Sequence, residues 1–368
     1  MDYKQDKRTI LSLDAGGTNF DFFAVHGGEI VTDKLRFSAS VDTLDDMLKM
    51  ILKGFEQLIQ QSGDRPAAIS FCFPGPADYK NGIIGDLENL PLFRGGVPLK
   101  DMLENHFGIP VFINNDGDLF AYGEAIAGML PEVNMAMKDA GSERKYNNLL
   151  GVTFGTGFGG GFVSSGKLFT GDNSAGMEIN RMRNKLYPQS SAEDSVTVRA
   201  IKRVYAREAG LNLNDTPEPE TIFKIGVGEL GGDRAAARKA FGELAEVAGD
   251  ALADAVTLTD SLVVIGGGLS GAWPLFMQQM VDEMNFAFKE LSGDDLPRME
   301  IYAYNLLNDD CAKDFYEDSS KQIKVPYSDK RVNYDPIKKI GVGISRLGTS
   351  KAVAIGAYAY ALNELSGI

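Results

Sequence analysis

The chain has 368 residues, of which 44% are hydrophobic and 24% are charged, and its formal net charge is −14. This length suits two domains with sizeable cores, and the composition is that of a globular protein. So acidic a chain repels nucleic acid backbones and anionic membranes, so we expect neither as a partner. Two cysteines and two histidines are too few for a disulfide framework or a histidine-rich metal site.

The first residues, MDYKQDKRT, are charged and lead directly into an apolar stretch, unlike a secretory leader. No apolar stretch in the sequence approaches the length of a membrane span. The sequence therefore predicts a cytoplasmic globular protein.

Residues 9–31, TILSLDAGGTNFDFFAVHGGEIV, contain a glycine turn between two stretches rich in β-branched and aromatic residues. This pattern predicts strand, turn, strand, and a dinucleotide-binding or Walker A loop is excluded because neither the helix nor the Lys-Ser/Thr pair follows. Glycines let the backbone bind an anion, and an acid beside phosphate suits a Mg²⁺ ion between them. By itself the pattern is equally compatible with a plain β-turn. The candidate phosphate-binding residues are Asp14, Gly16, Gly17, Thr18 and Asn19.

Residues 108–128 form a strand, PVFINN, followed by a helical stretch, DLFAYGEAIAG. Asp116 lies at the junction, where a side chain is held firmly and faces a cleft. Two interpretations are open at this point: Asp116 caps the helix, or it is a base that acts on a ligand in the cleft.

Two further glycine loops follow. Residues 149–171 place Gly155, Thr156 and Gly157 between apolar strands, with three more glycines just after them. In residues 261–276 a buried strand ends in Gly266, Gly267 and Gly268 before a helical stretch, which suits the packing of a flat base or ribose. Three such loops in this order favour a nucleotide site far more than one alone.

Together the three loops resemble those of the ATPase core shared by actin, Hsp70 chaperones and sugar kinases, and most closely the ROK family of sugar kinases and repressors. The matching motifs are DAGGTN, GTGFGGG with the following GKLFTG, GGG, and a terminal stretch, TSKAVAIGAYAYAL. The resemblance covers nearly the whole chain. It implies an α/β fold of two actin-like (ribonuclease H-like) domains with a cleft between them.

The resemblance also implies roles for single residues. Asp116 is the expected general base for a sugar hydroxyl, most simply O6, and Asp14 is expected to hold Mg²⁺ through water. Asp118 stands where the family usually has a second Asn, which leaves it without a role. The residues that resemble sugar-contacting positions are Gly75, Asn89, Asn115, Glu178, Asn180 and Glu193.

The segment between Glu178 and Glu193 departs from the family pattern, because it contains neither the usual histidine nor the cysteines of a zinc loop. The histidine's place falls on Asn180 or Arg181, and no zinc is expected. The alternative interpretation of Glu178 and Glu193 is that they are solvated loop acids. The missing histidine leaves the identity of the hexose open.

For the domains we expect a small N-terminal unit, 1–120, and a larger nucleotide-binding unit, 121–349. The larger unit carries an insertion at about 294–345, and a terminal helix at about 350–368 packs back on the smaller one. Residues 197–210 and 233–259 have helical spacing. The resemblance suggests a homodimer.

The sequence therefore predicts an ATP-dependent kinase for glucose, mannose, fructose or an N-acylhexosamine, with ATP and Mg²⁺ as cofactors. One competing hypothesis is a sugar-responsive repressor, although no helix-turn-helix segment precedes the first loop in this acidic sequence. Another is a sugar-binding regulator without catalytic activity.

Overall fold

The computed structural model describes residues 3–15, 19–63, 65–75, 77–85 and 91–367. The predicted site residues Gly16, Gly17, Thr18 and Asn89 lie outside these ranges. None of the described helices combines the length and the apolar character that a bilayer crossing needs.

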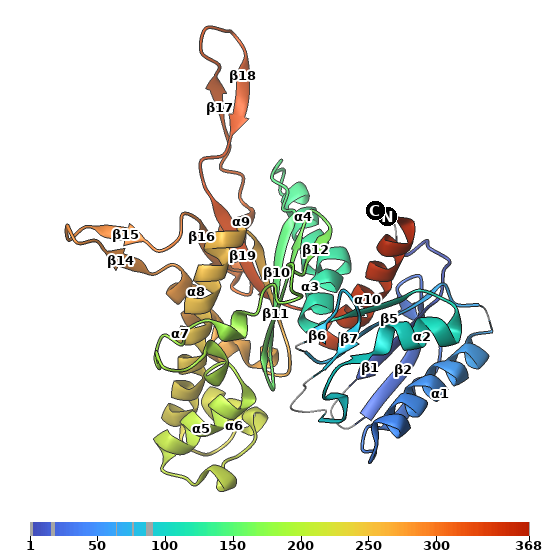
Figure 1. Cartoon of the computed structure of the whole chain (residues 1–368). Coiled ribbons are helices and arrows are strands. Elements are labelled where there is room, and N and C mark those ends of the chain that lie inside the picture. The colour runs from blue at the N-terminus through green and yellow to red at the C-terminus, as the bar shows by residue number, and fades with distance from the viewer. Residues whose placement is uncertain (1–2, 16–18, 64, 76, 86–90, 368) are drawn as a thin grey trace.

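The N-terminal part of the chain forms a six-stranded mixed sheet (Figure 1). Its strands are β1 (Ile10–Ala15), β2 (Asn19–His26), β3 (Glu29–Ile30), β4 (Leu35–Ser38), β5 (Ala68–Cys72) and β9 (Val111–Asn114). Strand β2 runs antiparallel to β1, whereas β5 and β9 continue the sheet in parallel. Because side chains alternate along a strand, Leu11 and Leu13 point to a core shared with α1 (Leu44–Ser62) and α2 (Leu99–Phe107). Short elements beside this sheet are β6 (Ala77–Asp78), β7 (Ile83–Ile84), η1 (Pro91–Phe93) and β8 (Val97–Pro98).

A second six-stranded sheet has the order β12-β11-β10-β13-β19-β16. Its strands are β10 (Asn148–Phe154), β11 (Phe158–Ser164), β12 (Lys167–Phe169), β13 (Leu262–Gly266), β16 (Tyr302–Asn305) and β19 (Lys339–Ile344). One face packs against α5 (Val198–Ala209), α6 (Pro219–Val227), α7 (Arg234–Thr259) and α8 (Met277–Met284). The helices predicted at 197–210 and 233–259 are thus confirmed as α5 and α7. On the other face lie α4 (Met129–Asp139) and α9 (Asp309–Tyr316). Four short 3₁₀ turns complete this part: η2 (Ile179–Arg181), η3 (Ala192–Asp194), η4 (Leu213–Asp215) and η5 (Ser270–Leu275).

The two sheets repeat one topology. Each begins with an antiparallel meander, β1-β2-β3 in one and β10-β11-β12 in the other, and continues with parallel strands on the far side of its first strand. The turn between the first two strands of each meander is one of the glycine turns predicted to bind phosphate. The repeat therefore places two equivalent turns in two equivalent sheets.

Two helices, α3 (Asp116–Ala127) and α10 (Thr349–Ser366), lie between the sheets (Figure 1). They cross so closely that a Cβ on Gly356 would lie 2.0 Å from the Leu119 carbonyl oxygen. A Cβ on Gly123 would lie 1.9 Å from the Ala352 carbonyl oxygen, so only glycine fits at either position. Tyr358 of α10 packs in the core that also holds Ile10 of the small sheet.

The structure narrows the predicted insertion at 294–345. Strands β16 and β19 belong to the large sheet, because each pairs in parallel with a neighbouring core strand. The parts that stand outside it are two hairpins, β14 (Ala287–Lys289) with β15 (Asp295–Pro297), and β17 (Lys321–Lys324) with β18 (Arg331–Tyr334). The sequence missed this because short buried strands cannot be assigned to a sheet from local pattern alone.

Candidate active site

Acidic side chains gather at the carboxyl edge of the small sheet. Asp14 of β1 pairs in register with Cys72 of β5, and Cys72 pairs with Asn114 of β9. Asp116 follows two residues later as the first residue of α3. Since parallel strands end at the same edge, residues 102 positions apart in the sequence become neighbours here.

A cavity of about 410 Å³ opens at this edge. Asp14 and Asp116 both line it, together with Cys72. The first two turns of α10 also line it, and Lys34 adds a positive charge. The α10 residues that line the cavity are Thr349, Ser350, Lys351, Val353, Ala354 and Ile355. The sequence analysis did not assign a role to the start of α10, because a helix N-terminus becomes part of a site only through its tertiary position.

The cap of α3 falls on Asn115 and not on Asp116. The Asn115 Oδ1 atom accepts a hydrogen bond from the Gly117 amide at 2.6 Å, the geometry of an N-cap residue. Asp116 is the first helical residue, and its Oδ1 accepts from the same amide at 2.8 Å. The helix-capping interpretation therefore describes Asn115, which leaves the Asp116 carboxylate free to act on a ligand.

Among the described residues, Asp14 and Asp116 at this edge form no ion pair. Burial raises the pKa of Asp14, and the nearby charges of Asp21 and Asp116 raise it further, whereas the charges of Lys34 and Arg36 lower it. Asp116 is open to solvent at the cleft, yet protein atoms crowd its carboxylate, and this desolvation raises its pKa against the hydrogen bond from Gly117. Acids placed together without a partner are typical of sites that bind a cation or move a proton.

The start of α3 is packed directly on the second glycine hairpin. A Cβ on Gly117 would lie 2.7 Å from the Gly160 carbonyl oxygen, and one on Gly161 would lie 2.4 Å from the Gly117 carbonyl oxygen. Backbone therefore touches backbone, and Asp116 is fixed relative to β11 as firmly as to the small sheet. This explains why β11 needs glycines after its turn.

At the second turn, the Gly155 amide donates to the Gly157 carbonyl at 3.0 Å, and Thr156 is exposed between them. Glu193 reaches the same turn, because its Oε2 accepts from the Phe158 amide at 3.1 Å. A predicted sugar-contacting acid and a predicted phosphate turn are thus in direct contact.

The third loop serves packing as much as binding. A Cβ on Gly266 would lie 2.6 Å from the Phe120 ring, and Gly267 adopts φ +87° with only 2.3 Å between such a Cβ and the Phe154 carbonyl oxygen. The Gly267 amide donates to Thr349 Oγ1 at 2.8 Å, which joins this loop to the start of α10. Gly268 has open space where a side chain would be. Of the three glycines, only Gly268 therefore presents free backbone to a ligand.

Further polar groups lie near Asp116, among them the predicted sugar-contacting residues Glu178 and Asn180. Burial, then the charges of Asp116 and Glu178, raise the pKa of Asp118 well above its ordinary value. Asp118 is only 6% exposed, and its Oδ1 has no hydrogen-bond partner among the described residues. The pKa of Glu178 is raised by burial, whereas Arg181 and Asn180 lower it. The Oδ1 atom of Asn180 is buried without a described partner, as expected of a group that awaits a ligand.

Tyr79 lies beside predicted sugar-contacting residues, and the sequence did not suggest it. It is buried, and its hydroxyl donates to the Phe73 carbonyl at 2.9 Å. A Cβ on Gly75 would lie 2.5 Å from this hydroxyl and 3.6 Å from Asn115 Nδ2, so the structure brings the predicted residues Gly75 and Asn115 together around Tyr79. Burial, then Asp116 and Asp118, raise the pKa of Tyr79, which keeps its hydroxyl protonated. No local motif marks it.

Asn19, the last described residue of the first phosphate turn, begins β2 and is exposed one register position beyond Ala15. Among the described residues, no group of three or more His, Cys, Asp or Glu is placed to hold a metal ion. A magnesium ion bound with a nucleotide needs only one or two carboxylates, because phosphate and water supply its other ligands. Asp14 and Asp116, which form no ion pair among the described residues, fit that requirement.

The side-chain amide of Asn184 holds the loop that carries Glu193 in place. Asn184 is fully buried, and its Nδ2 donates to the Ser191 carbonyl at 3.1 Å and to Ser195 Oγ at 2.8 Å. Its Oδ1 accepts from the amides of Leu186 and Tyr187, both at 3.0 Å. The four bonds fix both ends of the turn η3, on which Glu193 lies.

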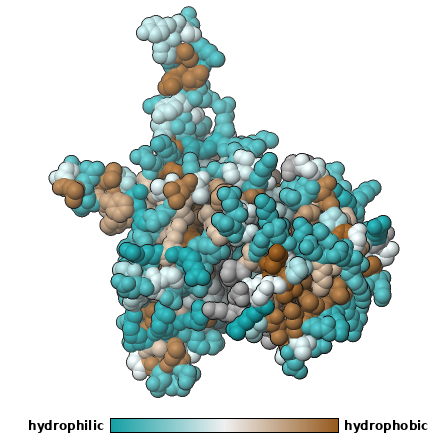
Figure 2. All heavy atoms as spheres, viewed as in Figure 1, coloured by the Kyte–Doolittle hydropathy of each residue, from teal (hydrophilic) through white to brown (hydrophobic). Residues whose placement is uncertain are grey.

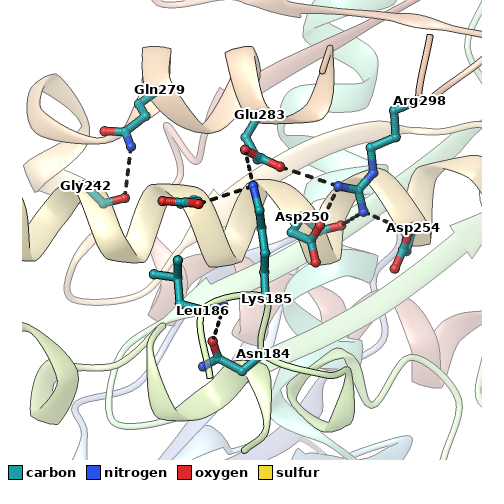
Figure 3. A network of polar contacts seen from close by, with 10 residues as sticks. Asn184, Lys185, Leu186, Gly242, Asp250, Asp254, Gln279, Glu283 and Arg298 are labelled. Carbon is teal, nitrogen blue, oxygen red and sulfur yellow. Dashed lines mark hydrogen bonds and ion pairs between the residues drawn. The ribbon is translucent and has the colours of Figure 1, made fainter. Parts of the chain in front are cut away.

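Beside Asn184, a network of ion pairs ties the same loop to α7 and α8 (Figure 3). Lys185 Nζ lies 2.8 Å from Glu283 Oε2, and Glu283 Oε1 lies 3.5 Å from the Arg298 guanidinium. Arg298 also pairs with Asp250 and Asp254. Each acid in this network faces a cation, whereas Asp14, Asp116 and Asp118 form no ion pair among the described residues.

Comparisons with known proteins agree with this geometry. The model of the ROK family matches residues 10–296. A crystal structure of a glucokinase from Parabacteroides distasonis is 48% identical, covers 99% of both chains and has a TM-score of 0.91. A glucokinase of Thermotoga maritima is 28% identical over 287 residues, which are 72% of this chain and 84% of the relative. An N-acetyl-D-glucosamine kinase of Vibrio cholerae is 30% identical over 46% of this chain and 51% of its own.

A ROK family glucokinase from Streptomyces griseus, solved with glucose and AMPPNP, shares the fold at a TM-score of 0.59 and 20% identity, covering 95% of this chain and 98% of its own. The repeated sheets, the acids at the carboxyl edge of the small sheet and the family match lead to one conclusion. The chain belongs to the ROK family and has its two-domain, actin-like ATPase fold.

Proposed function

We propose that this chain transfers the γ-phosphoryl group of ATP to O6 of a hexose, with Asp116 as the general base. The coarser statement is firm: the chain is an ATP-dependent sugar kinase, a transferase of the ROK family. The finer parts, which are the base, the hydroxyl and the individual binding residues, are the proposal.

The observation that carries the proposal is the position of Asp116. It begins α3 at the carboxyl edge of the small sheet, and its neighbour Gly117 touches the backbone of the second glycine hairpin. A base between the two units lies where a sugar hydroxyl can face a phosphate held by the hairpins. Phosphoryl transfer depends mainly on such alignment and on charge neutralisation.

In the proposed reaction an Asp116 carboxylate oxygen accepts the hydroxyl proton while the sugar oxygen bonds to the γ-phosphorus and ADP leaves. The raised pKa of Asp116 makes its carboxylate a better proton acceptor than an ordinary aspartate. Asp14 would hold Mg²⁺ through water, and that ion would neutralise charge on the phosphates. The backbone of Gly155–Gly157 and of the first glycine turn would position them.

The sugar would lie among Asn115, Gly75, Glu178, Asn180 and Glu193. The unpaired Oδ1 of Asn180 and the two glutamates accept hydrogen bonds, which suits the hydroxyl groups of a hexose. Glucose is the first substrate to test, because the relatives that match over most of this chain are glucokinases. N-acetylglucosamine is the second, since a partial relative is named for it. The cytoplasmic location and the absence of a bound zinc ion remain predictions.

The test is coupled ADP release with glucose, mannose, fructose and N-acetylglucosamine, followed by NMR of the product to identify the phosphorylated oxygen. Asp116→Asn should lose activity while it still binds sugar. Asp21→Asn is the matched control, because Asp21 is an acid of β2 already paired with Arg36 at 2.7 Å. Equal activity of Asp116→Asn and wild type would disprove the base assignment. Calorimetry that detects hexose binding without turnover in wild type would instead support the non-catalytic regulator.

A further inference from the structure

Two hairpins stand out from the body of the large domain (Figure 1). We call residues 287–297, with β14 and β15, the acidic arm, and residues 321–334, with β17 and β18, the basic arm. In the part of the chain that the structure describes, each forms a sheet of only two strands. A two-stranded hairpin alone is marginally stable in water, and its outer edges present unpaired backbone groups. Both arms therefore have the character of elements that pack against a partner.

Apolar side chains are exposed on both arms: Figure 2 shows brown spheres near the end of the acidic arm and partway along the basic arm. Leu291 on the acidic arm and Tyr327 on the basic arm are fully exposed at the tips. The other exposed apolar residues of the arms are Phe288, Leu296, Ile323, Val332 and Tyr334. Burying large apolar side chains is favourable, so their exposure on two projections marks a contact surface.

The arms carry opposite charge. The acidic arm has three acids, Glu290, Asp294 and Asp295, against one lysine. The basic arm has four cations, Lys321, Lys324, Lys330 and Arg331, against one aspartate. A basic projection is unusual in a chain whose net charge is −14. The two surfaces are complementary to each other in both charge and apolar character.

Both arms are fixed where they leave the body. Arg298, directly after β15, is 7% exposed, pairs with Asp250 and stacks on the Phe288 ring at 5.7 Å. At the basic arm Asn333 donates to Glu143 at 2.8 Å, and Asp335 pairs with Arg144 at 2.5 Å. Each arm therefore projects at a set angle, which lowers the entropy lost on association.

We infer that the acidic arm of one copy packs against the basic arm of a second copy of this chain. Around a twofold axis this contact occurs twice, because each copy supplies one arm of each kind. Electrostatic attraction favours contact between unlike arms over contact between like arms, and the apolar side chains provide the surface that the interface buries. The inference concerns assembly and does not depend on which sugar is phosphorylated.

The experiment is sedimentation velocity of the full chain over a wide range of protein concentration, with three charge variants, one apolar variant and two controls. Wild type should be a dimer. Lys330→Glu with Arg331→Glu sets like charges against the acidic arm, and we expect the dimer dissociation constant to rise at least about tenfold. Glu290→Lys with Asp294→Lys should do the same. Combining all four substitutions exchanges the charges of the two arms and should restore the dimer.

Lys53→Glu, on an exposed position of α1 in the small unit, is the matched control for charge and should leave the dimer intact. For the apolar part, Leu291→Ser with Tyr327→Ser should weaken the dimer, whereas Leu213→Ser at the exposed η4 turn should not. Circular dichroism verifies that every variant is folded. A monomeric wild type overturns the inference and leaves the arms to a different protein. The inference is also overturned if neither charge-reversed variant weakens the dimer, or if the variant with all four charge substitutions remains monomeric.

Discussion

The acids around Asp116 and those around Arg298 have opposite electrostatic environments. At Asp116 four carboxylates repel one another, and burial raises the pKa values of Asp14, Asp116, Asp118 and Glu178. At Arg298 the acids Asp250, Asp254 and Glu283 share one guanidinium, and Glu283 also meets Lys185. Unpaired acids cost stability and are kept for chemistry, whereas paired acids hold elements together.

The largest effect that tests this contrast is expected at Asp116. Asp116→Asn should lower kcat by about 10²–10⁴ while the protein remains as stable as wild type or becomes more stable, because a repelling charge is removed. The measurement is steady-state kinetics together with thermal unfolding. A variant that loses stability along with activity would place Asp116 among the structural acids.

Arg298→Ala should have the opposite profile. It leaves three acids near α7 and α8 without their common cation, and we expect a loss of about 3 kcal/mol in the free energy of unfolding. Urea unfolding measures this, and kcat at low temperature should change little. Arg36→Ala is the control, because Arg36 pairs with Asp21 on an exposed surface and should shift the midpoint hardly at all. Equal effects of the two arginine variants would contradict the structural role of the network.

Asn184 lies between the two regions, since it orders the loop that carries Glu193. Asn184→Ala removes four hydrogen bonds from buried groups, and we expect it to cost about 2 kcal/mol of stability. The sugar KM should also rise, with a smaller change in the KM for ATP. Asn212→Ala, which removes one exposed 3.3 Å bond, should change neither. If stability falls but the sugar KM does not change, Asn184 supports the fold and does not position Glu193.

The smallest effect is expected for the pH dependence that Asp118 confers. Burial raises the folded-state pKa of Asp118 well above the ordinary 3.8, so between the two values the folded state binds more protons than the unfolded state. Stability should therefore fall as pH rises through this interval. Asp118→Asn removes that loss, and we expect it to gain about 1 kcal/mol over wild type in mildly alkaline buffer. If the free energies of unfolding of the two proteins change equally with pH, Asp118 has a charge partner that stabilises its ionised form.

Much of the fold and of the site could be predicted because the relevant signals are local. The second glycine turn, the strand that ends at Asn114 and the helix that begins at Asp116 are contiguous patterns, and each was found where expected. Tyr79 and the first turn of α10 were missed, because each becomes part of the site only by packing. Strands β16 and β19, which lie within the expected insertion at 294–345, are short, and their membership of the large sheet is set by distant partners.

The sequence alone determined the kind of chemistry, because glycine spacing and an acid at a strand end are fixed by backbone geometry and charge over a few residues. Tertiary structure decided which groups share a site. It brought Asp14 to Asp116, assigned the cap to Asn115, and turned two of the three glycines at 266–268 into packing contacts. The physical reason is range: turn and helix preferences act between neighbours in the chain, whereas burial and Coulomb repulsion act between neighbours in space.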